Sequence, residues 1–207
     1  EVEMRKGIEA ELDIKILDLS PENISEYGVC GYKNVEKHLE LRRKIDWFGE
    51  YYQKGLRIKV VIHEEGGYQG MLEYIPGEFA HRPVEARGYL FIHCLFVGFK
   101  KEYKGRGFAS ALIEECIEEA RDQGKDGVAV VTRKGSFMAK KDIFLKHRFT
   151  GVDKAKPDFE LLALKFNEEA RDPQFRDMEA ALEKYNNGLY VIRSVQCPYT
   201  EKNVNGI

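Results

Sequence analysis

Apolar positions recur along this chain with two spacings, and each spacing predicts one type of element. Alternation of apolar and polar residues, or a short apolar run, predicts a strand, whereas apolar positions three and four residues apart predict a helix. Strands are predicted at 13–19, 56–63, 68–74, 89–97, 128–132 and 159–166, and helices at 34–54, 107–123 and 138–147. The nearly unbroken apolar run at 89–97 indicates a buried central strand.

The order of these elements predicts the fold class. A strand at 89–97, a helix at 107–123 and a strand at 128–132 form a crossover unit, and such a unit places its two strands parallel. The strands at 56–63 and 68–74 are joined by a short glycine-containing turn, which predicts an antiparallel pair. The sequence therefore predicts an α/β (α+β) fold in which helices flank a mixed sheet.

The pattern changes after Asn167. Asp172-Pro173 interrupts the chain, and a helical spacing at 175–185 and an apolar strand at 189–195 follow. We therefore divide the chain into a domain at 1–168 and a C-terminal extension at 169–207. The first residue is not Met and the extension is short, so the sequence does not establish where the natural protein begins or ends.

The clearest chemical signal lies between the strand at 89–97 and the helix at 107–123. Gly105 and Gly107 free backbone amides at the start of this helix, where the aligned peptide dipoles favour an anion. Lys104 and Arg106 add positive charge at the same point. The turn therefore predicts a site for a phosphate-bearing cofactor.

Composition narrows the choice of partners. The 207 residues carry a net charge of −2, so no basic field favours nucleic acid, and no apolar run approaches the roughly 20 residues that span a bilayer. The charged N-terminal stretch at 1–18 is unlike a signal peptide. We expect no metal and a reducing, cytoplasmic setting, because the cysteines follow no zinc or disulfide spacing: Cys30, Cys94, Cys116 and Cys197.

The residues of this turn resemble those of the GCN5-related N-acetyltransferase (GNAT) family. Its signature is Arg or Gln, two residues, Gly, one residue, then Gly or Ala, and Lys104, Gly107 and Ala109 stand at these three places. The order of elements from about 14 to 166 also matches, and the tail ending in Cys197-Pro-Tyr resembles the YoaP-like tail of one subgroup. Two other phosphate motifs fail, since the P-loop sequence is absent and the dinucleotide fingerprint needs glycine where Ser110 stands.

This resemblance implies a fold and a cofactor. The sheet is expected to be mostly antiparallel, with a central pair of parallel strands that splay apart around acetyl-CoA. The pyrophosphate is expected on the amides of the turn. The implied cofactor-binding residues are Leu95, Phe96, Val97, Lys104, Gly105, Arg106, Gly107, Phe108, Ala109 and Ser110.

The resemblance also implies catalytic residues. His93 stands where family members often carry Glu or His, and its imidazole titrates near neutrality, so it is the best candidate for the general base. The alternative is a buried, hydrogen-bonded histidine with no chemical role. The family's usual general acid is a tyrosine, but Phe144 stands at its position. Ser136 is the first candidate to replace it as the acid, and the alternative is that Ser136 only caps a helix. Tyr103 and solvent are the other candidates for the acid.

Cys94 and Cys197 each suggest an alternative function based on a reactive thiol. Cys94 adjoins His93, but adjacent strand residues point to opposite faces, so we expect a core thiol rather than a Cys–His pair. Cys197 opens a glutaredoxin-like turn, yet Thr200 replaces the second cysteine, which favours a structural turn.

The leading hypothesis is an N-acetyltransferase in which a primary amine attacks acetyl-CoA directly within a ternary complex. The amine acceptor is a small molecule or a peptide, and a homodimer is compatible with the sequence. The alternatives are a non-catalytic acyl-CoA-binding or sensing module, which the missing tyrosine favours, and a thiol-redox protein centred on Cys197.

Overall fold

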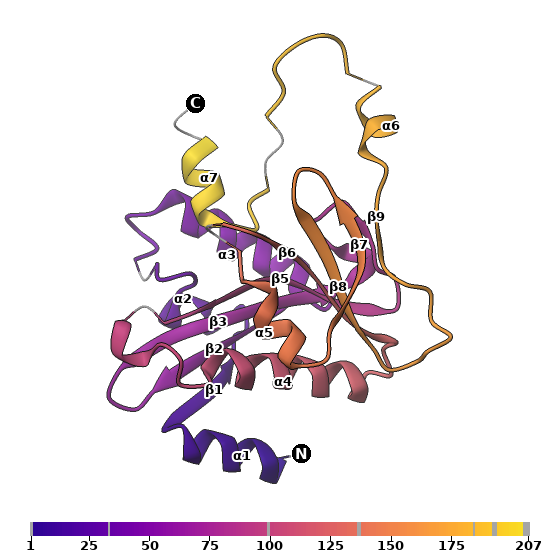
Figure 1. The fold of residues 1–207 in the computed structure, drawn as a ribbon. Helices are drawn as coiled ribbons and strands as arrows, with labels where there is room; N and C mark the ends of the chain where they lie inside the picture. Colours follow the sequence, from indigo (N-terminus) through magenta and orange to yellow (C-terminus); the bar gives the residue numbers. More distant parts are fainter. Residues whose placement is uncertain are drawn as a thin grey trace.

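The protein is built on a seven-stranded sheet in the order β1-β2-β3-β5-β6-β8-β7 (Figure 1). The computed structural model describes residues 2–32, 34–98, 100–135, 138–183, 185–191 and 194–204. The sheet strands are β1 (Ile14–Asp18), β2 (Arg57–His63), β3 (Gly67–Pro76), β5 (Tyr89–Val97), β6 (Gly127–Arg133), β7 (Thr150–Ala155) and β8 (Phe159–Lys165). Two short strands, β4 (Val84–Glu85) and β9 (Gln174–Phe175), pair separately.

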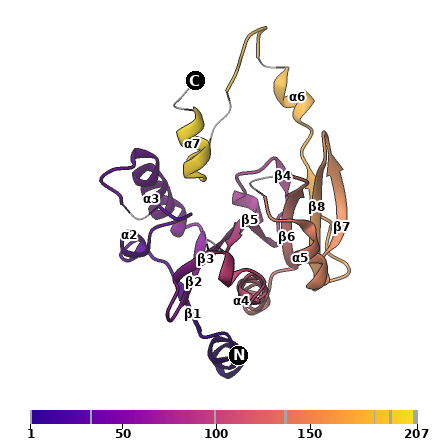
Figure 2. The same cartoon turned by 60° about the vertical axis from the view of Figure 1, so that its left-hand side comes forward.

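Helices cover both faces of the sheet. The α-helices are α1 (Val2–Glu11), α2 (Ile24–Tyr27), α3 (Leu39–Tyr52), α4 (Phe108–Asp122), α5 (Lys141–Lys146), α6 (Met178–Leu182) and α7 (Pro198–Val204), and the 3-10 turns are η1 (Gly77–Phe79) and η2 (Lys101–Tyr103). Figure 2 shows α1 and α4 on one side of the sheet and α3 with α7 on the other. In the described part of the chain, no helix has the length and apolar character needed to cross a bilayer.

The alternation along β3 explains how the sheet holds two apolar cores. Leu72 and Tyr74 face α4 and pack with its buried residues. Met71 and Ile75 face the opposite side and pack beneath α3. A central strand that is buried on both faces needs mostly apolar residues, and residues 71–75 of β3 are apolar except for Glu73.

The parallel pair that the sequence predicts is confirmed. β5 pairs with β6 in parallel from Tyr89↔Gly127 to Ile92↔Val130, while every other pair in this sheet is antiparallel. The pairing ends at Ile92↔Val130, although β5 continues to Val97 and β6 to Arg133. A mixed sheet whose two parallel strands part midway is the architecture expected from the sequence.

A β-bulge interrupts β5 at the point where it leaves β6. On its other side β5 pairs with β3, and the partners run from Tyr74↔Ile92 directly to Glu73↔Cys94. His93 is therefore an extra residue without a partner on β3. A bulge of this kind reorients the side chains that follow it.

Some predicted elements differ in the structure. The predicted helix at 34–54 begins only at Leu39, because the Asn34 side chain accepts the amide of Lys37 in a turn. The predicted strand at 189–195 is wrong over its described residues, none of which belongs to a strand, and Leu189 is 89% exposed rather than packed on a core. The predicted helix at 175–185 is reduced to α6, since Phe175 belongs to β9. The sequence reasoning missed α1 and β7.

Candidate active site

The turn between β5 and α4 is shaped by glycines. Gly105 has a φ of 77° and Gly107, the residue before α4, has a φ of 88°, a backbone region that other residues rarely adopt. Lys104, Gly105, Arg106 and Gly107 are exposed, while Phe108 is buried and fixes the helix to the core. The residues predicted from 104 to 107 therefore lie together on the surface at a helix N-terminus.

The first amides of α4 make this turn an anion site. The N–H groups in the first turn of a helix have no carbonyl partner within the helix. In α4 the first amide with a backbone partner is that of Ala111, which donates to the carbonyl of Gly107 at 3.0 Å. The amides of Phe108, Ala109 and Ser110 thus face outward at the positive end of the helix dipole.

The strand edge beside the turn is also free. Beyond Ile92, the side of β5 that faces β6 has no strand partner in the described part of the chain. Leu95 and Val97 pack toward α4, whereas Phe96 is on the other face and 39% exposed. Such an edge offers backbone donors and acceptors to an extended ligand that carries amide groups.

A buried polar cluster lies under α3, next to the bulge. The carboxylate of Glu73 on β3 is fully buried, and so is Lys44 on α3, whose ammonium donates to Oε2 of Glu73. Oε1 of Glu73 lies 3.2 Å from Nδ1 of His93 and accepts a second hydrogen bond, at 2.7 Å, from the side-chain amide of Gln196. Lys44 also lies 4.2 Å from the centre of the Trp47 ring.

The contacts of His93 define its tautomer. The backbone amide of His81 donates to Nε2 of His93 at 2.9 Å, so Nε2 carries the lone pair. Nδ1 then carries the hydrogen and donates to Glu73. The His93 side chain is 1% exposed, and both ring nitrogens are engaged in this state.

The cluster holds one balanced pair of charges. Burial lowers the pKa of His93 and outweighs the opposing bond to Glu73, so the imidazole is neutral at neutral pH. Burial by itself would raise the pKa of Glu73, but the Lys44 charge and the His93 hydrogen bond bring it down to about 2. Lys44 and Glu73 therefore form an ion pair beside a neutral histidine.

His81 forms the outer wall of the cluster. Its ring is half-buried and meets the edges of Trp47 and Tyr51, with centroids 5.0 and 4.7 Å away. Burial lowers the pKa of His81, and the neighbouring His93 lowers it further. The hydroxyl of Ser194 lies 3.5 Å from Nδ1 of His81.

The bulge overturns the expectation that His93 and Cys94 point to opposite faces. Cys94 stands opposite Glu73 in the register, and His93 hydrogen-bonds the Glu73 side chain, so both residues lie on the α3 face. A hydrogen bond with Cys30, together with burial, raises the pKa of the Cys94 thiol well above its usual value. Cys94 is thus a protonated, partly buried thiol and a poor nucleophile.

The candidates for the general acid occupy different surroundings. Ser136 falls outside the described residues. Phe144 is fully buried, and its ring packs against Phe149 with a centroid distance of 5.5 Å. Tyr103 lies at the cofactor turn, where its ring packs on that of His63 at 4.7 Å.

Cys197 immediately precedes α7, as its place in the Cys-Pro-Tyr-Thr turn suggests. The adjacent Tyr199 donates to the carbonyl of Cys30 at 3.0 Å and packs on Tyr32. Over the described ranges, no group of three or more His, Cys, Asp or Glu residues is arranged to hold a metal ion.

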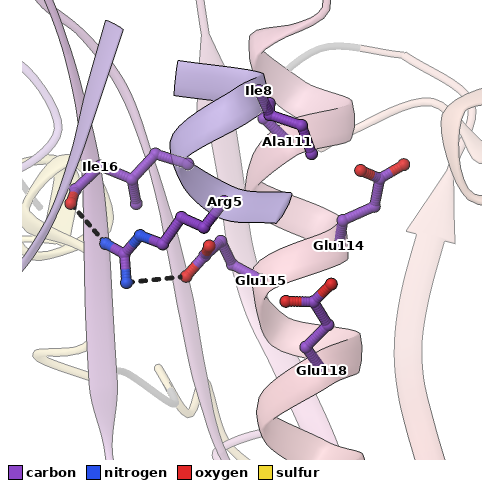
Figure 3. A pocket seen from close by; sticks show the side chains of 7 residues that line it. All are labelled: Arg5, Ile8, Ile16, Ala111, Glu114, Glu115 and Glu118. Atoms are coloured by element: carbon purple, nitrogen blue, oxygen red, sulfur yellow. Dashed lines mark hydrogen bonds and ion pairs between the residues drawn. The ribbon is translucent and has the colours of Figure 1, made fainter. Parts of the chain in front are cut away.

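Two hollows on the surface lie apart from these residues. Figure 3 shows the one between α1 and α4, where Arg5 bonds the carbonyl of Ile16 and the carboxylate of Glu115. Its volume of about 10 Å³ is that of one water molecule at most. The other, of about 550 Å³, follows the β7–β8 hairpin and is lined by four lysines and their neighbours: Lys134, Lys141, Lys154, Ala155, Lys156, Pro157, Asp158, Phe159 and Glu160.

Sequence reasoning missed Glu73, Lys44 and Gln196. One signal for Glu73 was present, because it interrupts the apolar positions Met71 and Ile75 on one face of a strand. Lys44 looks like an ordinary charged surface residue of the predicted helix, and Gln196 lies in a segment without helical or strand periodicity, so neither residue carried a signal in the sequence.

Known proteins resemble this chain in both sequence and fold. The model of the acetyltransferase (GNAT) family matches residues 23–140. The uncharacterized N-acetyltransferase YoaP of Bacillus subtilis is 26% identical over 194 residues, which cover 92% of this chain and 75% of that protein.

Two solved structures illustrate the likeness in fold. One is yncA of Salmonella typhimurium, solved with its cofactor acetyl-CoA; it has a TM-score of 0.52 and 16% identity, over 77% of this chain and 97% of that one. The other is the ribosomal-protein-alanine N-acetyltransferase of Brucella melitensis, with a TM-score of 0.51 and 18% identity over 73% and 99%. Taken with the free strand edge and the glycine turn, the family match shows that the chain belongs to the acetyltransferase (GNAT) family and is an acetyl-CoA-dependent N-acetyltransferase.

Proposed function

We propose that the protein acetylates a primary amine by direct attack within a ternary complex, with His93 as the general base. One observation carries this proposal: the hydrogen bond to Glu73 leaves the lone pair of His93 on Nε2, and His93 is the first residue of β5 beyond its last pair with β6. An imidazole held in this way takes the proton of the amine on Nε2, and the ionised Glu73 stabilises the imidazolium that forms.

The cofactor-binding residues of the proposal surround the same opening. The outward amides of Phe108, Ala109 and Ser110, with Lys104 and Arg106 beside them, fit a pyrophosphate. The free edge at Leu95–Val97 fits the amide-containing arm of coenzyme A. Acetyl-CoA supplies the activated acetyl group as a thioester when it is bound.

His81 controls access to the base in this proposal. Its backbone amide occupies Nε2 of His93, so the incoming amine must replace that hydrogen bond before it gives up its proton. The aromatic rings of Trp47 and Tyr51 beside His81 offer an apolar wall to the acceptor. The ion pair of Lys44 with Glu73 leaves the wall with little net charge, so charge alone does not select the acceptor.

The leaving thiolate needs little help. A free thiol has a pKa of about 8.5, so its anion leaves readily near neutral pH. We propose that Ser136 or solvent supplies the proton, since the ring of Phe144 carries no proton to donate.

The test is consumption of the acetyl-CoA thioester with a panel of small-molecule and peptide amines. Replacement of a general base lowers the rate by about 10²- to 10⁴-fold, so His93→Gln should do so while acetyl-CoA still binds. His147→Gln is the matched control, because burial also lowers the pKa of His147, which lies at the end of α5 beside Glu114.

Two outcomes would count against this function. An unchanged rate and pH profile in His93→Gln would remove His93 from the mechanism. Binding of acetyl-CoA without turnover of any amine would favour the acyl-CoA-binding module, the alternative that Phe144 supports.

A further inference from the structure

The C-terminal segment, residues 194–204, returns to the sheet and lies against α3 (Figure 1). Two contacts fasten it there. The buried carboxylate of Glu201 pairs with Arg43 on α3. The hydroxyl of Tyr199 donates to the carbonyl of Cys30 at 3.0 Å. The segment is therefore held in one place, although it follows a long excursion of the chain.

This segment brings two side chains to the polar cluster. The side-chain amide of Gln196 donates to Oε1 of Glu73 at 2.7 Å, and that oxygen is also the one that faces His93. The hydroxyl of Ser194 lies near the ring of His81. It also accepts a hydrogen bond from the backbone N–H of Gln196 at 3.1 Å, which fixes the backbone of Gln196. Ser194 thus contacts His81, whose amide bonds Nε2 of His93, and Gln196 contacts Glu73, which lies next to Nδ1 of His93.

We infer that Gln196 is a positioning residue for acetyl transfer: it acts through Glu73, by hydrogen-bonding the carboxylate oxygen that faces His93 and limiting the negative charge that His93 senses. The inference rests on the proposed role of His93 as the base. It assigns part of the active site to the C-terminal extension, since residue 196 lies beyond the stretch 23–140 that the family model matches.

The physical argument concerns the charge that His93 senses. The groups that face His93 are Glu73 on β3, Lys44 on α3, and His81 and Arg82 in the loop before β4. The N–H of Gln196 partly neutralises the oxygen of Glu73 that faces His93. Without it, this oxygen attracts a proton on His93 more strongly, so the pKa of His93 rises.

The test compares Gln196→Met with Tyr199→Phe. Methionine keeps the length and most of the volume of glutamine but donates no hydrogen bond. We expect the acid limb of kcat/KM against pH to move upward by about one unit, which corresponds to a tenfold change in the protonation equilibrium. Tyr199→Phe removes an anchor of the same segment without touching the cluster, so its acid limb should stay in place.

Titration of His93 by NMR gives a readout that does not depend on activity. A higher pKa of His93 in Gln196→Met than in the wild type would support the inference, even with an acceptor of low turnover. An unchanged or lower pKa would overturn it, as would an equal rise in Tyr199→Phe, because loosening of the segment would then be the cause. If His93→Gln keeps full activity while the pKa still shifts in Gln196→Met, the proposed base is wrong and the contact with Glu73 stands.

Discussion

Nδ1 of His93 lies 3.2 Å from Oε1 of Glu73, and this contact exists because a bulge in β5 turns His93 toward the carboxylate on β3. Both side chains are withdrawn from water. A buried carboxylate is costly unless it is paired, and Lys44 supplies the pairing charge from α3. The ion pair and the histidine are therefore one unit in both stability and chemistry.

Lys44→Met should be strongly destabilising. The substitution leaves the charge of Glu73 buried without its ionic partner, which costs about 3–5 kcal/mol of the free energy of unfolding. The double variant Lys44→Met/Glu73→Leu should recover most of this loss, because it removes both charges together. Urea unfolding at pH 7 measures both values.

Lys54→Met is the matched control for this prediction. Lys54 lies just past the C-terminal end of α3 and pairs with Glu50 at 3.5 Å on the surface, where such pairs contribute about 0.5 kcal/mol or less. Equal losses in the two lysine variants would contradict the view that burial gives the Lys44–Glu73 pair its importance.

Acid should destabilise the protein in two steps. The folded pKa values of His93 and His81 lie below 6.5, so the unfolded chain binds more protons just below pH 6.5 and the free energy of unfolding falls as pH is lowered through that range. The contribution of Glu73 is complete above pH 4.5 and is lost as pH falls toward its folded pKa of about 2. Urea titrations between pH 8 and 3 measure the first step and the onset of the second.

His93→Gln separates the contributions to this acid response. Since glutamine does not titrate, the variant should lose part of the first step and keep the second. A free energy of unfolding that stays level from pH 8 to 5 in the wild type would show that these histidines titrate alike in the folded and unfolded chains.

Gly107 and Gly124 bracket α4, and they allow a matched test of the cofactor turn. Both have positive φ, 88° and 62°, so alanine should cost about 1–2 kcal/mol at either place. A Cβ at Gly124 meets no atom within 4 Å, and one at Gly107 meets only Leu12, at an ordinary 3.7 Å. We expect at least about tenfold weaker acetyl-CoA binding in Gly107→Ala alone, because only that change shifts the amides that face the cofactor.

Isothermal calorimetry with acetyl-CoA and thermal unfolding of both glycine variants provide the measurements. Similar melting temperatures with a difference in affinity would support the turn as the cofactor site. Undiminished binding in Gly107→Ala would remove it from that role.

The parts of the site that the sequence predicts are those governed by local rules. Gly105 and Gly107 mark a positive-φ turn before a helix, and the strand–helix–strand order fixes the parallel pair of β5 with β6. Each of these follows from a few neighbouring residues. The structure accordingly brings residues 104–107 together at the N-terminus of α4.

The catalytic surroundings depend on long-range packing, which local rules do not reach. Strict alternation puts His93 and Cys94 on opposite faces, and no residue type in this stretch announces the bulge that places them together. The contact of Gln196 with Glu73 joins residues 123 positions apart, in a segment without helical or strand periodicity. Such a contact arises from the path of the whole chain.

Phe144→Tyr tests whether the usual acid of the family has simply been lost. The ring of Phe144 is fully buried in the core beneath the sheet, so a hydroxyl there would have to be buried as well. An unpaired buried hydroxyl costs about 1–3 kcal/mol, so we expect lower stability in urea unfolding and no gain in turnover. Phe149→Tyr is the matched control, since its ring packs on that of Phe144 and is only 2% exposed. Faster turnover in Phe144→Tyr alone would instead mean that this position still reaches the leaving thiolate, and Ser136 would lose its proposed role.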